Sequence, residues 1–263
     1  MYPTPRHVGL VNWVGLWTLY AKEVHRFIKV AGQTVLAPII TTLLFLLIFQ
    51  LALGESRGPV GGVPFEVFLA PGLVMMAVTQ NAFQNASSSL LISKIQGNIV
   101  DLLMPPLSAA EMLIAFCGAA ITRGFAVAIC VLIAMSLFVD LPFASIGWAV
   151  LFVFLMSLMM GLLGVLTGLW ADKFDHMAFI TNFIITPLAF LSGTFYSIER
   201  LPDLAQAIAH VNPFFYAIDG FRHAIVGQGD TSMLLGATVL LGINAVLAVW
   251  AFVLVRRGYN LKA

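Results

Sequence analysis

Six apolar runs of about twenty residues or more divide this sequence and decide what it can fold into. They cover residues 30–53, 65–92, 109–139, 144–170, 177–195 and 233–255. A helix of about 20 apolar residues crosses a bilayer with its backbone polar groups satisfied internally. With 60% hydrophobic and only 10% charged residues, a chain of 263 residues has too few charges to solvate a globule. The prediction is an all-α membrane protein with six transmembrane helices, the first one kinked by Pro38.

The stretch between the fifth and sixth runs is interrupted by polar residues. The apolar pieces on either side of the Asn212-Pro213 pair are too short to cross a bilayer. Backbone that does not span survives at membrane depth only where protein or water satisfies its polar groups. Residues 197–227 are therefore predicted to re-enter the membrane without crossing it, and Asp219 and Arg222, three apart, to form a local ion pair.

Residues 1–29, before the first run, contain the pattern of an amphipathic helix. Apolar side chains between Trp13 and Ile28 share one arc, whereas Lys22 and Arg26 lie opposite. We expect this helix to lie in the membrane interface rather than to cross it. A soluble amphipathic helix packed on a partner domain is the alternative, although this chain holds no such domain. Residues 30–263 are expected to form one six-span domain.

The second run carries a polar face in its deeper half. On a helical wheel one arc collects six amide and hydroxyl side chains, namely Gln80, Asn81, Gln84, Asn85, Ser87 and Ser88. Such a face must meet other helices or water, because lipid offers it no partners. Interhelical hydrogen bonding and the lining of a substrate pathway both explain it, and the pattern leaves both open.

Arg123 lies near the middle of the third run, where a cation costs about 3 kcal/mol even on lenient insertion scales. In a structural role it would reach back to an aqueous edge or pair with Asp172 or Asp175. In a functional role it would line the cytoplasmic entrance and meet an anionic substrate group. Both roles remain open at this point.

Basic residues are concentrated on one side of the predicted spans. Six spans place both termini on that side, together with Arg6, Lys22, Arg26, Lys29, Lys94, Lys173, Arg256, Arg257 and Lys262. The opposite side has only Arg57, Arg200 and Arg222. By the positive-inside rule the termini and residues 94–104 are cytoplasmic, and the segment 197–227 is on the outer face.

Catalytic and metal-binding patterns are missing from the sequence. No Gly-rich loop ends in Gly-Lys-Ser/Thr, so the chain has no loop of its own for nucleotide phosphates. The one Gly-x-Ser sequence, Gly54 to Ser56, falls in an outer loop, and the five histidines lie at span ends or outside spans, which predicts no metal site. A net charge of +1 without a basic stripe argues against nucleic acid as a partner.

Residues 94–104 leave the membrane and are predicted to form a short amphipathic surface helix that has no partner within the chain. The sequence QGNIVDLLMPPLS, residues 96–108, resembles the central cytoplasmic motif of the ABC type-2 permeases, the membrane subunits of ATP-driven exporters. FLSGTFYSIERLP, residues 190–202, followed by NPFFYAIDGFRHAIVG, residues 212–227, resembles the C-terminal signature of the same family. The resemblance extends over essentially the whole chain and is closest to the bacterial YadH-like branch.

The resemblance implies a homodimer docked on two separately encoded ATPase subunits, which would hold ATP and Mg²⁺, so that this chain binds no cofactor. Helix 94–104 would be the coupling helix seated in the ATPase, with the 12–28 helix as a second contact. The implied coupling residues are Ile95, Gln96, Gly97, Asn98, Ile99, Asp101, Leu102 and Leu103. The family motif commonly has an acid where this chain has Val100, which leaves Asp101 as the one carboxylate in the motif.

The resemblance also implies a substrate path at the homodimer interface, between the first, second and fifth spans. Its candidate residues are Gln80, Asn81, Gln84, Asn85, Ser88 and Arg123. An outer gate would comprise Phe195, Tyr196, Asn212, Pro213, Asp219 and Arg222. We expect the permease subunit of an ATP-driven exporter in a bacterial inner membrane, embedded in lipid, with both termini cytoplasmic and no catalysis of its own. An ATPase-independent carrier or channel for a small amphipathic solute is the alternative.

Overall fold

Long apolar helices make up most of the computed structural model, which describes residues 9, 11–53, 60, 62–196, 198 and 202–261. In this part of the chain the secondary structure is helical, apart from one isolated bridge between Val60 and Val63. Five helices are long and apolar enough to cross a membrane: Gly32–Ala52, Phe65–Ile95, Ala109–Ser136, Ile146–Trp170 and Met233–Arg257. The prediction of an all-α membrane protein is confirmed at this level.

The helices follow the apolar runs closely. In chain order they are α1 (Trp13–Ile28), η1 (Gly32–Leu36), α2 (Ala37–Leu53), α3 (Phe65–Ile95), α4 (Ile99–Leu103), α5 (Ala109–Ser136), α6 (Ile146–Trp170), α7 (Phe174–Ile180), η2 (Thr181–Ile185), α8 (Thr186–Phe190), α9 (Asp203–Val211), α10 (Pro213–Val226) and α11 (Met233–Arg257). The label η marks a π-helical turn, in which an amide bonds the carbonyl five residues earlier.

The first span carries such a turn directly before its proline. Pro38 has no N–H to donate, and the backbone N–H of Ala37 bonds the carbonyl of Gly32 across η1. Where the sequence predicts a kink at Pro38, the structure has a π-helical turn on its N-terminal side, after which α2 continues to Leu53.

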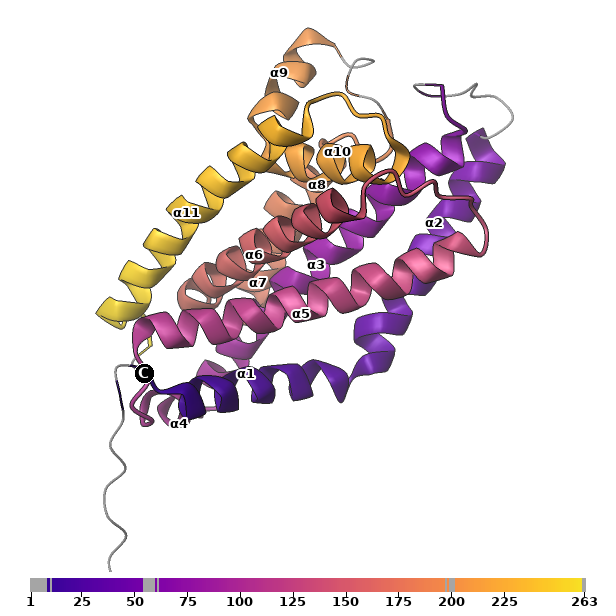
Figure 1. Ribbon diagram of the computed structural model, residues 1–263. Coiled ribbons are helices and arrows are strands. Elements are labelled where there is room, and N and C mark those ends of the chain that lie inside the picture. The colour runs from indigo at the N-terminus through magenta and orange to yellow at the C-terminus, as the bar shows by residue number, and fades with distance from the viewer. Residues whose placement is uncertain are drawn as a thin grey trace, which may run out of the picture.

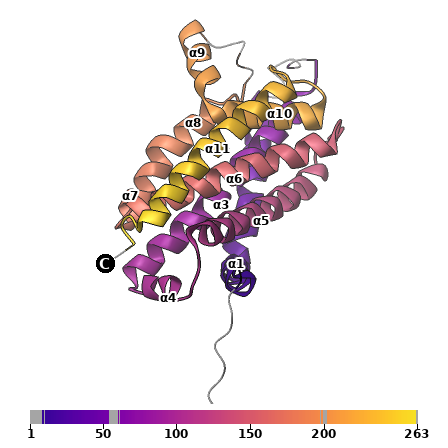
Figure 2. The ribbon, with the colours of Figure 1, turned by 60° about the vertical axis from the view of Figure 1, so that its left-hand side comes forward.

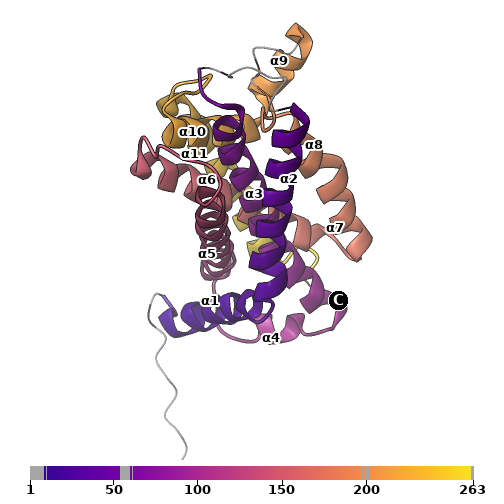
Figure 3. The same cartoon turned by 90° about the vertical axis from the view of Figure 1, so that its right-hand side faces the viewer.

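The predicted fifth span, 177–195, is displaced and shorter. Helical backbone begins at Phe174 and ends at Phe190, where a turn with Gly193 at a positive φ of 72° stops it. This apolar run, α7–η2–α8, falls below the length of the five longer helices. It nevertheless carries the chain from the end of the bundle near α4 to the end near α10 (Figures 1 and 3).

The two ends of the bundle hold different elements. Helices α1 and α4 and the C-terminal end of α11 lie at one end, which we call the terminal end, and α9 and α10 lie at the other (Figures 1 and 2). Helix α1 runs across the terminal end rather than along the bundle (Figure 3). Helix α1 and the C-terminal end of α11 therefore lie at the same end as α4 (Figures 1 and 2). Arg6, Ser56, Arg57, Arg200 and Lys262, used in the sequence analysis, lie outside the described residues.

Helix α3 is the central element, because nearly all of its spanning segment is buried against other helices. Glycines of α6 allow the closest approach. A Cβ atom at Gly164 would lie 2.6 Å from the carbonyl oxygen of Phe83, and one at Gly168 would lie 2.8 Å from Cβ of Leu90. The polar half of α3 is consequently held at short range by α6 on one side.

The helix predicted over 94–104 is broken in two, which corrects the sequence analysis. Ile95 is the last residue of α3, Gly97 adopts a left-handed φ of 74°, and only Ile99–Leu103 form α4. Ile99 and Leu102 are buried in a cluster with residues of α1, α3 and α5. These two side chains therefore have partners inside the chain, contrary to the expectation of an unpartnered helix.

Candidate functional site

A cleft between α2 and α3 is lined by part of the predicted polar face. The α2–α3 cleft has a volume of about 260 Å³, and its walls are Gln33, Ala37, Pro38, Thr41, Thr42 and Phe45 on one side and Leu73, Met76, Ala77, Gln80, Asn81 and Gln84 on the other. Gln80 stands at the middle of the 31-residue α3, so the cleft lies at mid-membrane depth if α3 spans.

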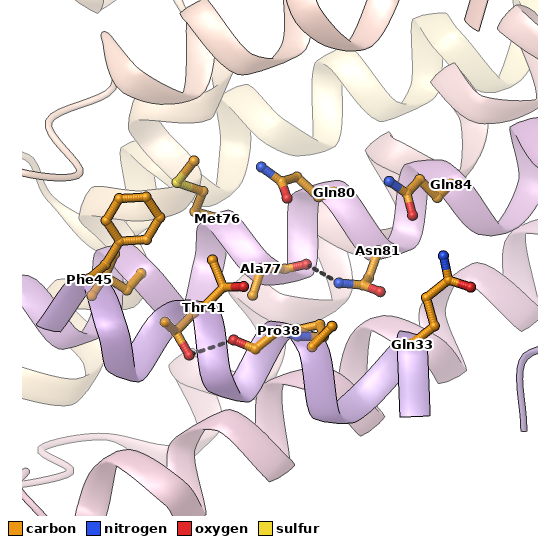
Figure 4. Close-up of a pocket in the computed structure, with 12 residues that line it drawn as sticks. Gln33, Pro38, Thr41, Phe45, Met76, Ala77, Gln80, Asn81 and Gln84 are labelled. Carbon is orange, nitrogen blue, oxygen red and sulfur yellow. Dashed lines mark hydrogen bonds between the residues drawn. The ribbon is translucent and has the colours of Figure 1, made fainter. Parts of the chain in front are cut away.

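The cleft is polar at one end and apolar at the other, as Figure 4 shows. The amide groups of Gln33, Gln80 and Gln84 gather at its polar end, whereas Phe45 and Met76 form its apolar end (Figure 4). Gln33 and Gln84 are exposed, and no formal charge lines the walls. The arrangement offers uncharged hydrogen-bond donors and acceptors beside hydrocarbon and aromatic surface, which suits an amphipathic, uncharged group.

Asn81 connects the cleft to the buried arginine. Its Nδ2 donates to the carbonyl of Ala77 at 3.0 Å (Figure 4), and its Oδ1 accepts from Nε and Nη2 of Arg123 at 3.3 and 2.8 Å. Arg123 is only 6% exposed and is not among the residues that line the cleft. The prediction that Arg123 pairs with Asp172 or Asp175 is wrong, because Arg123 has neither as an ion-pair partner. Asp172 instead lies 3.4 Å from Nζ of Lys94.

Helix α1 supplies a second cation to α3, and the amphipathic pattern did not predict it. Arg26 was assigned to the solvated arc, yet its Nη1 donates to Oγ of Ser88 at 3.1 Å and its Nη2 to Oδ1 of Asn85 at 3.3 Å. Glu23, fully buried, accepts from Nε of Arg26 at 3.1 Å and from Oγ of Ser89 at 2.7 Å. We call these five side chains the α1–α3 clamp.

The predicted polar face is therefore divided between two environments. Gln80, Asn81 and Gln84 line the α2–α3 cleft, whereas Asn85 and Ser88 are bonded by Arg26 of α1. The sequence left two explanations of the polar face open. Interhelical hydrogen bonding accounts for the polar residues of α3 nearer the terminal end, whereas the residues nearer the middle of α3 line a cleft.

Asp219 and Arg222 lie on buried α10 and do not pair within 4.0 Å, which corrects the predicted ion pair. Asp219 accepts from the backbone N–H groups of Asp230 and Thr231, both at 2.8 Å, and from the Thr231 hydroxyl at 2.7 Å. Arg222 donates to the carbonyls of Phe68 and Gly193, at 3.2 and 2.6 Å, and its guanidinium lies 3.9 Å from the Phe68 ring centre. Each charge thus anchors a different loop to α10.

The other predicted gate residues cluster where α2, α8 and α10 meet. The Phe195 ring lies 4.9 Å from that of Phe49 and 5.3 Å from that of Phe190, and the Tyr196 hydroxyl donates to the Phe190 carbonyl. Asn212 is buried, caps α10 by accepting from the Phe214 N–H at 3.1 Å, and donates to the Leu188 carbonyl at 2.7 Å. Pro213 is the first residue of α10.

A surface at the terminal end exposes apolar side chains around α4. Ile95, Val100, Leu103 and Met104 are all more than 40% exposed, and Met104 reaches 77%. Val100 and Met104 were not among the predicted coupling residues. The missed signal was their spacing relative to Ile99 and Leu102, since the latter two occupy the buried face and leave the other side of the turn open. Gln96, Gly97, Asn98 and Asp101 flank this surface.

Within the described residues, no group of three or more His, Cys, Asp or Glu side chains is arranged to bind a metal ion.

Comparison with known proteins adds the family. The family described as ABC-2 type transporter matches residues 14–226. The chain is 36% identical over 255 residues to the inner membrane transport permease YadH of Escherichia coli (strain K12), covering 95% of this chain and 98% of that protein. It is 25% identical over 235 residues to nodulation protein J of Neorhizobium galegae, covering 88% of each. The chain thus belongs to the ABC-2 type transporter family and is one of its membrane-embedded transport permeases.

Proposed function

We propose that this chain is the permease subunit of an ATP-driven exporter in a bacterial inner membrane, acting as a homodimer with a separate ABC ATPase. The observation that carries the proposal is the α2–α3 cleft, which is lined near the middle of α3 by the partly exposed Gln80 and the exposed Gln84. Amides in contact with lipid would be unsatisfied, so this wall needs a second protein surface or water. A second copy of the chain would supply that surface and enclose a path.

The path would be formed by α2, α3 and the α7–η2–α8 run, which we propose as a sixth crossing. Gln80, Asn81 and Gln84 would contact the substrate, with Gln33 added from the first span. Arg123, Asn85 and Ser88 would position this wall rather than touch the substrate, because none of them lines the cleft and each is bonded to Asn81 or Arg26. The substrate would be amphipathic, in keeping with the polar and apolar ends of the cleft.

The ATPase would dock at the terminal end, which we propose to be cytoplasmic. Residues 95–103 would remain the coupling segment, with Ile95, Val100, Leu103 and Met104 as its exposed apolar contacts. Ile99 and Leu102 would carry the motion inward, since they pack against α1 and α3. Helix α1 would lie in the membrane interface, with exposed Trp13 and Trp17 toward the lipid headgroups.

ATP and Mg²⁺ would be bound by the partner subunits, and the chain itself would perform no catalysis. At the opposite end, the cluster around Phe195 and Asn212 would act as the outer gate. Closure of the ATPase dimer would push on α4 and, through the α1–α3 clamp, on the polar half of α3. The cleft would then open toward the outer gate.

The test is transport by the purified chain with and without a partner ABC ATPase. Co-purification of the ATPase and vanadate-sensitive uptake into inside-out vesicles are expected from the complex. Gln84→Leu should reduce that uptake without reducing ATPase binding, whereas Leu241→Gln, a change at an exposed position of α11, serves as a control for expression. Vanadate-insensitive transport by the chain alone would instead identify an ATPase-independent carrier.

A further inference from the structure

A second and larger concave surface lies on the other side of the α7–η2–α8 run from α2. This α8–α11 groove has a volume of about 750 Å³, which is within the range of pockets that bury most of a small amphipathic ligand. The groove separates the α7–η2–α8 run from α11, which pass side by side in Figure 2. Its floor is formed by α6 and α3, including Met159, Leu163 and Phe83.

The lining of the groove changes in polarity along its length. Toward α10 and over most of its length it consists of aliphatic and aromatic side chains, such as Ile184, Leu188 and Phe214. Its polar lining groups, Thr167, Trp170, Trp250 and Tyr259, all lie in the half toward the terminal end. Trp and Tyr are the side chains that favour the boundary between lipid tails and headgroups. The groove therefore matches a hydrocarbon chain whose polar end lies beside Trp170 and Tyr259.

The face of α11 that lines the groove continues into a basic residue. Ile243, Leu247, Trp250 and Leu254 recur at intervals of four, three and four, and Arg257 follows three residues later on the same face. Arg256 points about 100° away from Arg257 around the helix and lies off the face. Both arginines are exposed in the last turn of α11.

The charge around this end of the groove favours an anion. Near this end of the groove, the ends of α3, α6, α7 and α11 carry four basic residues and two acidic ones. The basic residues are Lys94, Lys173, Arg256 and Arg257, and the acidic residues are Asp172 and Asp175. Asp172 is already engaged, since it lies 3.4 Å from Lys94 Nζ and accepts from Asn260 at 2.9 Å. Basic residues at a membrane surface attract anionic headgroups.

We propose that the α8–α11 groove is a binding site for an anionic glycerophospholipid. One acyl chain lies along Leu163, Ile184 and Leu247, and the phosphate is held at Arg257 beside Trp170 and Tyr259. The site is separate from the α2–α3 cleft, because no residue lines both. A bound lipid here packs against the run that forms one side of the proposed path, so its occupancy stabilises that run.

The experiment uses the full chain in nanodiscs of phosphatidylcholine that contain a phosphatidylglycerol with a photoactivatable diazirine on its acyl chain. Mass spectrometry of the cross-linked peptides should find the label on groove residues of α8 and α11. Unlabelled phosphatidylglycerol should compete with groove labelling several-fold better than extra phosphatidylcholine does. This competition uses the wild-type chain, so it does not depend on how any variant folds.

Two matched pairs of variants sharpen the test. Leu247→Trp fills the groove and should lower its labelling several-fold, whereas Val246→Trp, on the exposed side of α11, should not. Arg257→Gln should remove the preference for phosphatidylglycerol, whereas Arg256→Gln should keep it. Equal competition by the two lipids, equal effects within each pair, or cross-linking of the groove to a second copy of the chain would overturn the proposal.

Discussion

Arg123 of α5 donates two hydrogen bonds to the same oxygen, Oδ1 of Asn81 on α3, at 3.3 and 2.8 Å. The contact joins a buried cation to a residue that also lines the α2–α3 cleft. The fixed carboxamide of Asn81 bonds the Ala77 carbonyl through Nδ2, so both ends of the side chain are occupied. Arg123 therefore orients one wall of the cleft while remaining outside it.

Asn81→Leu should destabilise the protein by leaving the Arg123 guanidinium buried without its acceptor. Loss of a hydrogen bond to a charged group costs about 2 kcal/mol, which thermal unfolding in detergent would detect as a lower Tm. The double variant Asn81→Leu/Arg123→Leu should regain much of that loss, since a buried polar pair can be replaced by packed apolar groups. Strictly additive losses in the double variant would show that the two residues are not coupled.

The α1–α3 clamp predicts that replacing a single buried carboxylate will lower the stability of the protein. Glu23→Gln keeps the shape of the side chain but removes the anion that faces Arg26 at 3.1 Å. Because Glu23 is fully buried, breaking this pair should cost about 3 kcal/mol in the free energy of unfolding.

The neighbouring Lys22 provides the control for this change. Its Nζ lies 3.8 Å from Glu23 but its side chain is 57% exposed, so Lys22→Gln should shift stability by only about 0.5 kcal/mol. Chemical denaturation followed through tryptophan fluorescence measures both variants. Similar small shifts for Glu23→Gln and Lys22→Gln would mean that the clamp does not hold α1.

The long helices could be predicted from sequence because their cause is local. An apolar run of twenty or more residues must satisfy its backbone internally, and this requirement alone gives α2, α3, α5, α6 and α11 to within a few residues. The bounds predicted for the fifth span, 177–195, differ more from the structure, where the helical run extends from Phe174 to Phe190. Its end depends on Gly193, whose left-handed conformation brings the chain back under α10, where its carbonyl accepts from Arg222.

The partners of the charged residues could not be predicted, because they depend on contacts far apart in the chain. A helical wheel assigns Arg26 to water, yet residues about 60 positions away supply its acceptors. Asp219 and Arg222 have the spacing of an ion pair, but each is satisfied by a backbone segment outside α10. The polar face of α3 was identified correctly as a feature, and its division between cleft and clamp required the position of α1.

The surface around α4 allows binding and stability to be separated. Met104→Asp places a charge on a side chain that is 77% exposed, so it should weaken co-purification of the ATPase while leaving Tm unchanged. Leu102→Ala empties a buried site and should cost about 2 to 4 kcal/mol of stability. Pull-down with a tagged ATPase and thermal unfolding measure the two effects. A Met104→Asp protein that binds the ATPase normally would exclude this surface as the docking site.

The contact of Asp172 with the C-terminal residues predicts a pH dependence. A hydrogen bond from Asn260, with a further contribution from Lys94, holds the pKa of Asp172 below its ordinary value. A carboxylate with a lowered pKa adds stability above its unfolded pKa of about 3.9, and this contribution is lost as the pH falls through the folded pKa. The difference in Tm between wild type and Asp172→Asn should therefore be constant from about pH 8 to 5 and shrink below about pH 4. A difference that grew on acidification would contradict this sign.

Asn212 makes the strongest prediction at the opposite end, because one side chain caps α10 and ties it to the end of α8. Asn212→Ala removes the cap on Phe214 and the bonds to the Leu188 carbonyl and the Ser192 hydroxyl. The capping loss alone should cost about 1 kcal/mol, and transport should fall while ATPase binding is retained. Ser232→Ala is the matched control, since Ser232 is an exposed cap of α11 with a single 3.3 Å bond from Leu235. Export equal in the two variants, measured at equal amounts of folded protein, would show that the junction between α8 and α10 has no part in the outer gate.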